Sequence, residues 1–177
     1  IFPAINSAGY PFIALFFFIA SLLSLFSDFL GWIGFLLSLW CVYFFRDPER
    51  VTPDIKNTVI SPADGKIVKV VSAKSPENLQ DKQPIQMTKI SVFMNVFNVH
   101  SNRSPIEGTI KSVDYQPGNF FNADLDKASE QNERNSVLFV DKSGRRLTCI
   151  QIAGLVARRI CCYVSPGDTV QRGARFG

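Results

Sequence analysis

The first 45 residues contain an apolar stretch far longer than a water-soluble domain of this size normally carries. A single charge, Asp28, interrupts the stretch. It separates two apolar runs, Tyr10 to Phe26 and Phe29 to Phe45, each about 17 residues long, which is the lower limit for a helix that crosses a bilayer. We therefore expect residues 1–45 to form an α-helical membrane hairpin, either as two full spans or as a re-entrant hairpin.

The charged residues begin where the apolar stretch ends. All 19 Lys and Arg and 14 of the 15 acids lie in residues 46–177, so this part has a net charge of +5. Basic residues beside an apolar segment mark its cytoplasmic side, and anionic head groups attract them. We predict a body at the inner (cytoplasmic) membrane that faces the cytoplasm, with a membrane surface and no nucleic acid as partner. An ordinary solvated basic surface explains the charge equally well.

Short runs of strand-forming residues make up the rest of the chain. After a linker rich in proline and charge, runs of Val, Ile, Phe and Thr alternate with Asp-Gly, Glu-Gly, Ser-Gly and Pro-Gly-Asp turns, a pattern typical of a small β structure. We expect a mainly β, barrel-sandwich body over residues 46–177. The predicted strands are residues 59–60, 66–71, 89–99, 108–113, 136–140, 146–153 and 157–164.

Two stretches in the body, "DGKIVKV" and "PGDTVQRGARF", are similar to the turns of lipoyl and biotinyl carrier domains. Those domains are flattened barrels made of two hammerhead halves, so the resemblance implies a lipoyl-like fold. The chain has no Met-Lys-Met turn to carry the prosthetic group. We therefore expect the fold without lipoylation or biotinylation.

A polar segment, Asn119 to Asn135, interrupts the series of strands with "NFFNADLDKASEQNERN". Loops of this length are commonly lids or binding loops, although a surface loop with a helical turn is the plainer interpretation. The four cysteines lack the C-x-x-C spacing of a zinc site, and only one histidine is present to complete one. We predict reduced cysteines and no metal.

The candidate chemical residues are His100 and Asp64. His100 ends an apolar strand, where a lone imidazole is more often structural than catalytic, but polar side chains such as Asn98 and Arg103 surround it in the sequence. Asp64 lies in "SPADGKI", which reads first as a tight turn with a positive φ at Gly65. If Asp64 and His100 met, they would provide the orienting acid and the base of a triad, and no serine in this chain is an obvious nucleophile.

The sequence stops at Gly177, after the turn-like "SPGDTVQRGARFG". Either the polypeptide is longer, or a glycine at this position has a chemical role. The ordered motifs "FFRDPER", "SPADGKI", "MNVFNVHSNRSPIEG", "NERN", "VARRI" and "RFG" resemble the beta chain of a phosphatidylserine decarboxylase of the short, membrane-anchored class. The resemblance runs from about Phe44 to Gly177 in the order of the family.

The resemblance implies a proenzyme that cleaves itself after Gly177. The serine expected at the next position would become a pyruvoyl cofactor at the start of a separate alpha chain, which is then the partner of this chain. The enzyme would convert phosphatidylserine to phosphatidylethanolamine with loss of CO2. Asp64 matches the acidic residue of the self-cleavage triad, and His100 matches the histidine associated with decarboxylation.

One position departs from the family pattern. Where the family has the second histidine of a His-x-x-His stretch, this chain has Arg103. Either His100 serves both self-cleavage and decarboxylation, which we favour, or cleavage uses a different base. The candidate contacts to the lipid head group are Asn98, Arg103, Asn132, Arg134 and Arg158.

Two non-catalytic alternatives fit the same organisation of hairpin and body. A membrane-anchored adaptor with a lipoyl-like barrel would need long heptad-patterned helices, and the sequence has none. A plain interaction domain on a membrane hairpin would use the same motifs as turns. The sequence leaves open whether identical protomers associate.

Overall fold

The computed structural model describes residues 3–55, 57–75, 85–121 and 131–177. The chain divides into two compact units. The hairpin unit comprises Ile1–Arg50 and Met94–His100, and the sheet unit comprises Val51–Phe93 and Ser101–Gly177. His100 is thus the last residue of the segment that packs in the hairpin unit.

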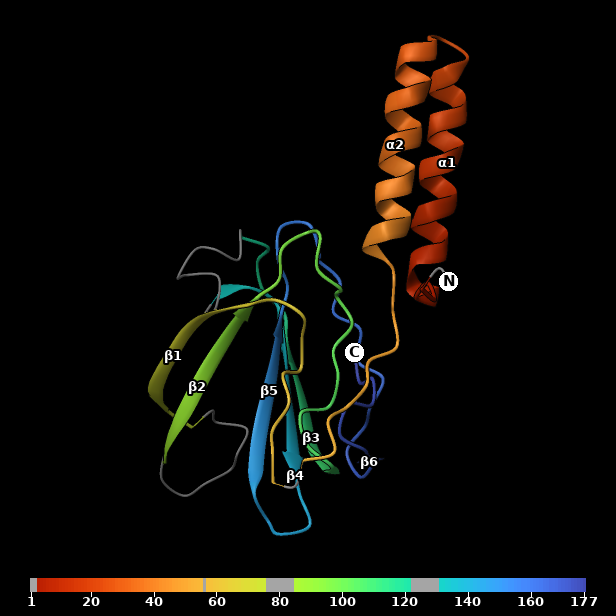
Figure 1. Cartoon of the computed structure of the whole chain (residues 1–177). Coiled ribbons are helices and arrows are strands. Elements are labelled where there is room, and N and C mark those ends of the chain that lie inside the picture. The colour runs from red at the N-terminus through yellow and green to blue at the C-terminus, as the bar shows by residue number, and fades with distance from the viewer. Residues whose placement is uncertain (1–2, 56, 76–84, 122–130) are drawn as a thin grey trace. The chain divides into compact units, whose positions relative to one another are not determined.

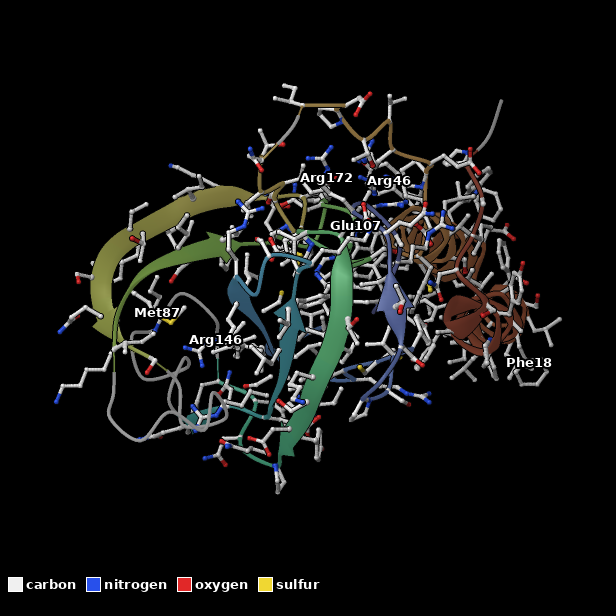
Figure 2. The ribbon with its side chains drawn as sticks, turned by 90° about the horizontal axis from the view of Figure 1, so that it is seen from below. Phe18, Arg46, Met87, Glu107, Arg146 and Arg172 are labelled. Carbon is white, nitrogen blue, oxygen red and sulfur yellow. The ribbon has the colours of Figure 1, made fainter. Side chains whose placement is uncertain are left out.

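The hairpin unit contains the two predicted apolar helices, connected by a tight turn (Figure 1). A short 3-10 turn, η1 (Ser7–Gly9), leads into α1 (Tyr10–Ser24), and α2 is Asp28–Phe44. Residues Ser7–Ser24 form one helical stretch that is long and apolar enough to cross a membrane, and α2 is slightly shorter. Apolar side chains cover the outside of the pair, as Phe18 on α1 illustrates (Figure 2).

Small residues let the two helices approach closely. A Cβ on Gly34 would lie 2.8 Å from the Cα of Ala20, so glycine is required at this crossing. Ser38 is fully buried one turn further along, where its hydroxyl donates to the Gly34 carbonyl over 2.8 Å. Small residues at a helix interface are typical of membrane helices, since lipid provides no hydrophobic force between them.

In the described part of the sheet unit, six strands form two antiparallel sheets. The larger sheet has the order β5-β4-β3-β6, and the smaller one pairs β1 with β2 as a curved ribbon (Figure 1). The bounds are β1 (Lys66–Lys74), β2 (Gln86–Phe93), β3 (Gly108–Gln116), β4 (Arg134–Val140), β5 (Arg146–Ile152) and β6 (Thr169–Val170). The body is β-rich, as the sequence predicts, and the whole chain is mixed α and β.

One face of the larger sheet carries the hydrophobic core. Phe139 and Val137 on β4 and Ile110 on β3 are essentially inaccessible to solvent, and Phe176 from the C-terminal segment packs against them. The rings of Phe139 and Phe176 meet edge to face, with centroids 5.4 Å apart. Because Phe176 is fully buried, the backbone at the adjacent Gly177 is fixed relative to the sheet.

A single arginine ties the linker after the hairpin to the C-terminal segment. The guanidinium of Arg172 donates to the carbonyl oxygens of Pro53 and Ile55 at 2.8 and 2.7 Å, and to the hydroxyl of Thr58 at 2.7 Å. Figure 2 labels Arg172 beside this linker. These bonds hold an otherwise irregular stretch of backbone.

Three predicted strands differ from the structure. Residues 157–164 and 59–60 form no strand, and the strand predicted over 89–99 ends at Phe93. Beyond Phe93 the side chains of Asn95 and Asn98 accept hydrogen bonds from nearby backbone N–H groups, both at 2.9 Å. Asparagine side chains compete with a strand ladder in this way, and here they produce turns. The other two stretches have strand-forming composition but pair with no strand among the described residues.

Candidate functional site

His100 lies against the last turn of α2. Its imidazole is 4.4 Å from the ring of Phe44, measured between centroids, and the two planes are inclined by 33°. The ring is half-buried. The segment that carries it is held by Arg46, whose guanidinium donates to the Phe97 carbonyl over 2.7 Å and to the Tyr43 carbonyl over 2.8 Å. The end of the apolar hairpin therefore builds the surroundings of the only histidine in the chain.

The surroundings of His100 favour the neutral form of its imidazole. Burial lowers its pKa below the ordinary value of 6.5, the hydrogen bond with the Asn98 carbonyl opposes this, and the nearby Arg46 charge lowers the pKa further. The Nδ1 atom lies 3.0 Å from that carbonyl oxygen. Since a carbonyl only accepts, Nδ1 carries the proton, and the neutral ring presents its lone pair on Nε2.

Asp64 lies in the turn that precedes β1. The hydroxyl of Ser61 donates to the Ala63 carbonyl at 2.8 Å within this turn, and the Pro62 carbonyl accepts from the backbone N–H of Arg103 at 2.9 Å. Asp64 is half-buried and belongs to the sheet unit, whereas His100 belongs to the hairpin unit. The turn is thus connected to the residues that directly follow His100.

Glycine is needed next to Asp64 for a reason other than the predicted one. Positive φ angles occur at Gly144, Gly167 and Gly173 among the described glycines, and Gly65 is not among them. A Cβ on Gly65 would instead clash with the carbonyl oxygen of Phe93. The expected positive φ at Gly65 is therefore wrong, and close approach of two backbones is what requires the glycine.

Gly177 is held by a short antiparallel ladder. The backbone N–H of Asn102 donates to the Gly177 carbonyl oxygen at 2.6 Å, and the N–H of Phe176 donates to the Asn102 carbonyl at 3.0 Å. The ladder continues with Ser104, whose N–H donates to the Ala174 carbonyl at 2.7 Å. Asn102 follows His100 after one intervening residue.

A chain of side-chain amides leads from the sheet to Gly177. Asn135 on β4 and Gln151 on β5 are opposite each other in the strand register, and Nδ2 of Asn135 donates to Oε1 of Gln151 at 3.0 Å. Nε2 of Gln151 in turn donates to Oδ1 of Asn102 at 2.8 Å and to the Cys161 carbonyl at 3.3 Å. A Cβ on Gly177 would clash with that same Nε2 atom.

The sequence did not single out Asn102, Asn135 or Gln151. A signal was nevertheless present, because Asn135 and Gln151 lie on the same face of their strands, "RNSVLFV" and "RLTCIQI", as the core residues Val137, Phe139 and Cys149. A polar residue at a core-facing position of a strand needs a partner. Their pairing across β4 and β5 could have been read only with the strand register known.

The predicted head-group contacts are scattered over the fold. Asn132 is buried, and its amide bonds the backbone of Phe121 and the carbonyl of Ala153, all at 2.9 Å. Arg134 donates from Nε to Gln116 at 2.7 Å. The side chains of Asn132 and Arg134 therefore both form hydrogen bonds within the fold.

The remaining candidates are more open. Arg158 is exposed, with its guanidinium 5.7 Å from the ring centroid of Phe120. Arg103 donates to the Gly173 carbonyl at 3.1 Å, and Asn98 supplies the carbonyl that contacts His100. The predicted loop over residues 119–135 lies partly outside the described residues, since 122–130 are not among them. Within the described residues, no three potential metal ligands cluster.

Comparison with known protein families assigns the chain. Residues 37–177 match the family model described as phosphatidylserine decarboxylase. The chain belongs to the phosphatidylserine decarboxylase family. The match includes the Asp64 turn, the His100 segment and the ladder at Gly177, so the resemblance noted in the sequence is confirmed. The protein is a decarboxylase, and its family supports phosphatidylserine as the substrate and phospholipid biosynthesis as the process.

Proposed function

We propose that this chain is the beta chain of a pyruvoyl-dependent phosphatidylserine decarboxylase whose proenzyme cleaves itself after Gly177. The observation that carries the proposal is the family match over residues 37–177 together with the way Gly177 is held. Its carbonyl oxygen accepts a 2.6 Å hydrogen bond from Asn102, and its surroundings leave no space for a side chain. A glycine without a side chain, held in place by a ladder, suits attack on its carbonyl by the following residue.

The residues present fit a pyruvoyl group at the position after Gly177, because the ladder fixes the backbone from which that position continues. When bound, the group supplies an electron-withdrawing carbonyl that accepts the electrons released as CO2 leaves. It would lie on the alpha chain, the partner produced by the cleavage. The product that is released is phosphatidylethanolamine.

His100 is the proposed acid and base. In self-cleavage, the neutral Nε2 takes the proton of the serine hydroxyl, and the lowered pKa of His100 keeps Nε2 unprotonated at neutral pH. In decarboxylation, the same ring delivers the proton that replaces the lost carboxylate on the product. Asp64 is proposed as the acidic residue of the triad, as the resemblance to the family implies. His100 serves both steps because Arg103 occupies the second histidine position of the family pattern.

Among the candidate head-group contacts, Arg158 is favoured because its guanidinium is exposed, whereas the amide of Asn132 is used within the fold. Arg103 and Asn98 are still predicted to contact the head group, because they lie near His100 in the sequence. The same prediction stands for Arg134. An arginine is well suited to a phosphate group because its planar fork donates two parallel hydrogen bonds.

The membrane arrangement is also a proposal. Residues 1–45 form the anchoring hairpin and residues 46–177 the catalytic body, which faces the cytoplasm because basic residues begin at Arg46. The substrate is a membrane lipid, so an anchored body keeps the site next to its substrate. A lipoyl-like barrel-sandwich, completed by the alpha chain, remains the proposed form of the body.

The test uses the protein encoded by the whole gene. We expect mass spectrometry to find this chain ending at Gly177 and a second, shorter chain whose blocked N-terminus is reduced by borohydride. A product that remains one polypeptide and releases CO2 from phosphatidylserine at full rate would overturn the proposal.

Two substitutions test the proposed roles. Asp64→Asn should leave the precursor uncut, whereas the control Asp54→Asn, in the exposed linker, should be cut normally. His100→Ala should leave the precursor uncut and release no CO2, because His100 is proposed to serve both steps, and normal turnover in this variant would remove His100 from the mechanism. Both are scored by gel analysis of the precursor and by radiolabelled CO2.

A further inference from the structure

The carbonyl oxygen of Gly177 is already hydrogen-bonded where negative charge would develop during cleavage. When the serine Oγ attacks the Gly177 carbonyl carbon, the carbonyl electrons move to the oxygen. The backbone N–H of Asn102 lies 2.6 Å from that oxygen. Fixed donors at such a position stabilise the transition state of acyl transfer.

The proposal that follows rests on the proposed self-cleavage. We propose that the backbone amide of Asn102 is the oxyanion donor for cleavage after Gly177, and that Gln151 is the positioning residue that holds Asn102 in place. The step is balanced within the chain. The serine proton passes to a base, a C–O bond forms at Gly177, the C–N bond breaks, and the freed amine receives the proton, which leaves an ester.

The argument for Gln151 begins with its hydrogen bonds. Both hydrogens of its Nε2 are used, one to Oδ1 of Asn102 at 2.8 Å and one to the Cys161 carbonyl at 3.3 Å. Its Oε1 accepts from Asn135, which is only 2% exposed. The amide therefore has one orientation that satisfies all its partners, and this orientation fixes the side chain of Asn102.

The strand register explains why the amide is rigid. Asn135 and Gln151 face each other on β4 and β5, next to the fully buried Val137 and Phe139. A ladder bond between Asn102 and Gly177 would be an ordinary structural contact by itself. An amide pair made of the buried Asn135 and the half-buried Gln151, extending from the sheet to that ladder, is not needed for packing, since apolar residues would fill the same positions at lower cost.

Close approach gives the second, independent support. A Cβ on Gly177 would clash with Nε2 of Gln151 and would lie 2.6 Å from the Cys161 carbonyl oxygen. The backbone carbonyl of Cys161 restricts residue 177 to glycine, and the Gln151 amide that positions the donor lies against the same position. Steric selection and hydrogen bonding act at one peptide group.

The test measures cleavage of the full-length precursor. Gln151→Leu keeps the approximate size of the side chain and removes its hydrogen bonds. Loss of one oxyanion donor lowers rates by about 10²–10³, and because the amide of Asn102 is displaced and not removed, we expect cleavage to slow by roughly 10- to 100-fold. The matched control is Gln171→Leu, an exposed glutamine of the neighbouring turn, which should cleave at the rate of the wild type.

Hydroxylamine identifies the affected step, because it cuts an ester that has already formed. If Gln151 supports ester formation, hydroxylamine will not restore cleavage of Gln151→Leu. Restored cleavage would place the defect after the ester and overturn the proposal. If Gln151 only stabilised the fold, its loss would impair ester formation and the later cleavage of the ester alike.

A double-mutant cycle checks that Gln151 acts through Asn102. Asn102→Ala keeps the backbone N–H and removes the partner of Gln151, so it should also slow cleavage, and the double variant should be no slower than Gln151→Leu alone. If Gln151→Leu fails to fold, Asn102→Ala with hydroxylamine answers the question by itself. A wild-type precursor that does not cleave refutes the proposed function, whereas full-rate cleavage by a folded Gln151→Leu or Asn102→Ala precursor refutes only this inference.

Discussion

At the scale of single residues, His100 is governed by two opposing effects of Phe44. The aromatic ring excludes water, which favours the neutral imidazole, and its face attracts a cation, which favours the protonated form. Cation–π attraction at accessible sites is about 0.5–1 kcal/mol. The pKa of His100 is nevertheless lowered, with burial as the largest cause. We therefore expect the exclusion of water by Phe44 to outweigh its attraction for a cation.

Replacement of Phe44 by alanine should raise the pKa of His100 toward 6.5, because it exposes the imidazole to water. Phe44→Tyr keeps the ring and should leave the pKa low. His100 is the only histidine in this chain, so NMR of protein labelled at histidine follows its titration, and His100→Gln identifies the signal. An unchanged pKa in Phe44→Ala would show that this contact does not set the proton affinity.

The same shift predicts how acid affects stability. Because the folded pKa lies below the unfolded one, the unfolded chain binds more protons, and stability rises with pH through this range. The contribution of His100 is fully present above the unfolded pKa of about 6.5 and is lost as the pH falls toward the folded value. Thermal unfolding midpoints at pH 7.5 and 5.5 should therefore differ more for the wild type than for His100→Gln. An equal difference in the two proteins would contradict the assignment.

At the scale of elements, the linker after the hairpin depends on Arg172. Arg172→Ala removes hydrogen bonds to Pro53, Ile55 and Thr58. These bonds are partly exposed, so we expect a loss of about 1–2 kcal/mol in the free energy of unfolding, less than buried charged bonds would give. Chemical denaturation measures it, with the exposed Lys111→Ala on β3 as control. A loss equal to that of the control would show that the hydrogen bonds of Arg172 do not stabilise the fold.

The strands were predictable where the pattern of residues also implied a partner. β3, β4 and β5 contain predicted runs because apolar residues alternate between strong turn signals, and their neighbours in sequence are their neighbours in the sheet. Residues 157–164 have similar composition but lie where no strand pairs with them. Composition measures how well a segment fits a sheet, and pairing decides whether it joins one.

The site was predictable only in part for a related reason. His100 stood out as a lone histidine among polar neighbours, and Gly177 through the family motif. The contact of His100 with Phe44 joins residues 56 positions apart, and the amides of Asn135 and Gln151 become a pair only through the strand register. Such long-range relations have no local signature in a single sequence.

At the scale of the whole molecule, α1 has an exposed apolar surface, and we expect this surface to lie in lipid. Phe18 lies near the middle of α1 and is 61% exposed. A lysine near the bilayer centre costs about 2.5–3.5 kcal/mol on insertion scales, so Phe18→Lys should weaken membrane association. Alkaline extraction of membranes measures it, with Phe18→Leu as the control. Equal retention of both variants would argue that α1 does not lie within the bilayer.

The Phe44 ring beside His100 belongs to the last turn of α2 and not to the sheet. Solubilisation conditions that fray the end of that helix would change the acidity of the imidazole while leaving the β structure intact. Circular dichroism and thermal melts of a purified sample would then report a well-folded enzyme whose rate constants differ from those in liposomes. Activity measured in micelles should accordingly be compared with activity in nanodiscs before any pH optimum is interpreted.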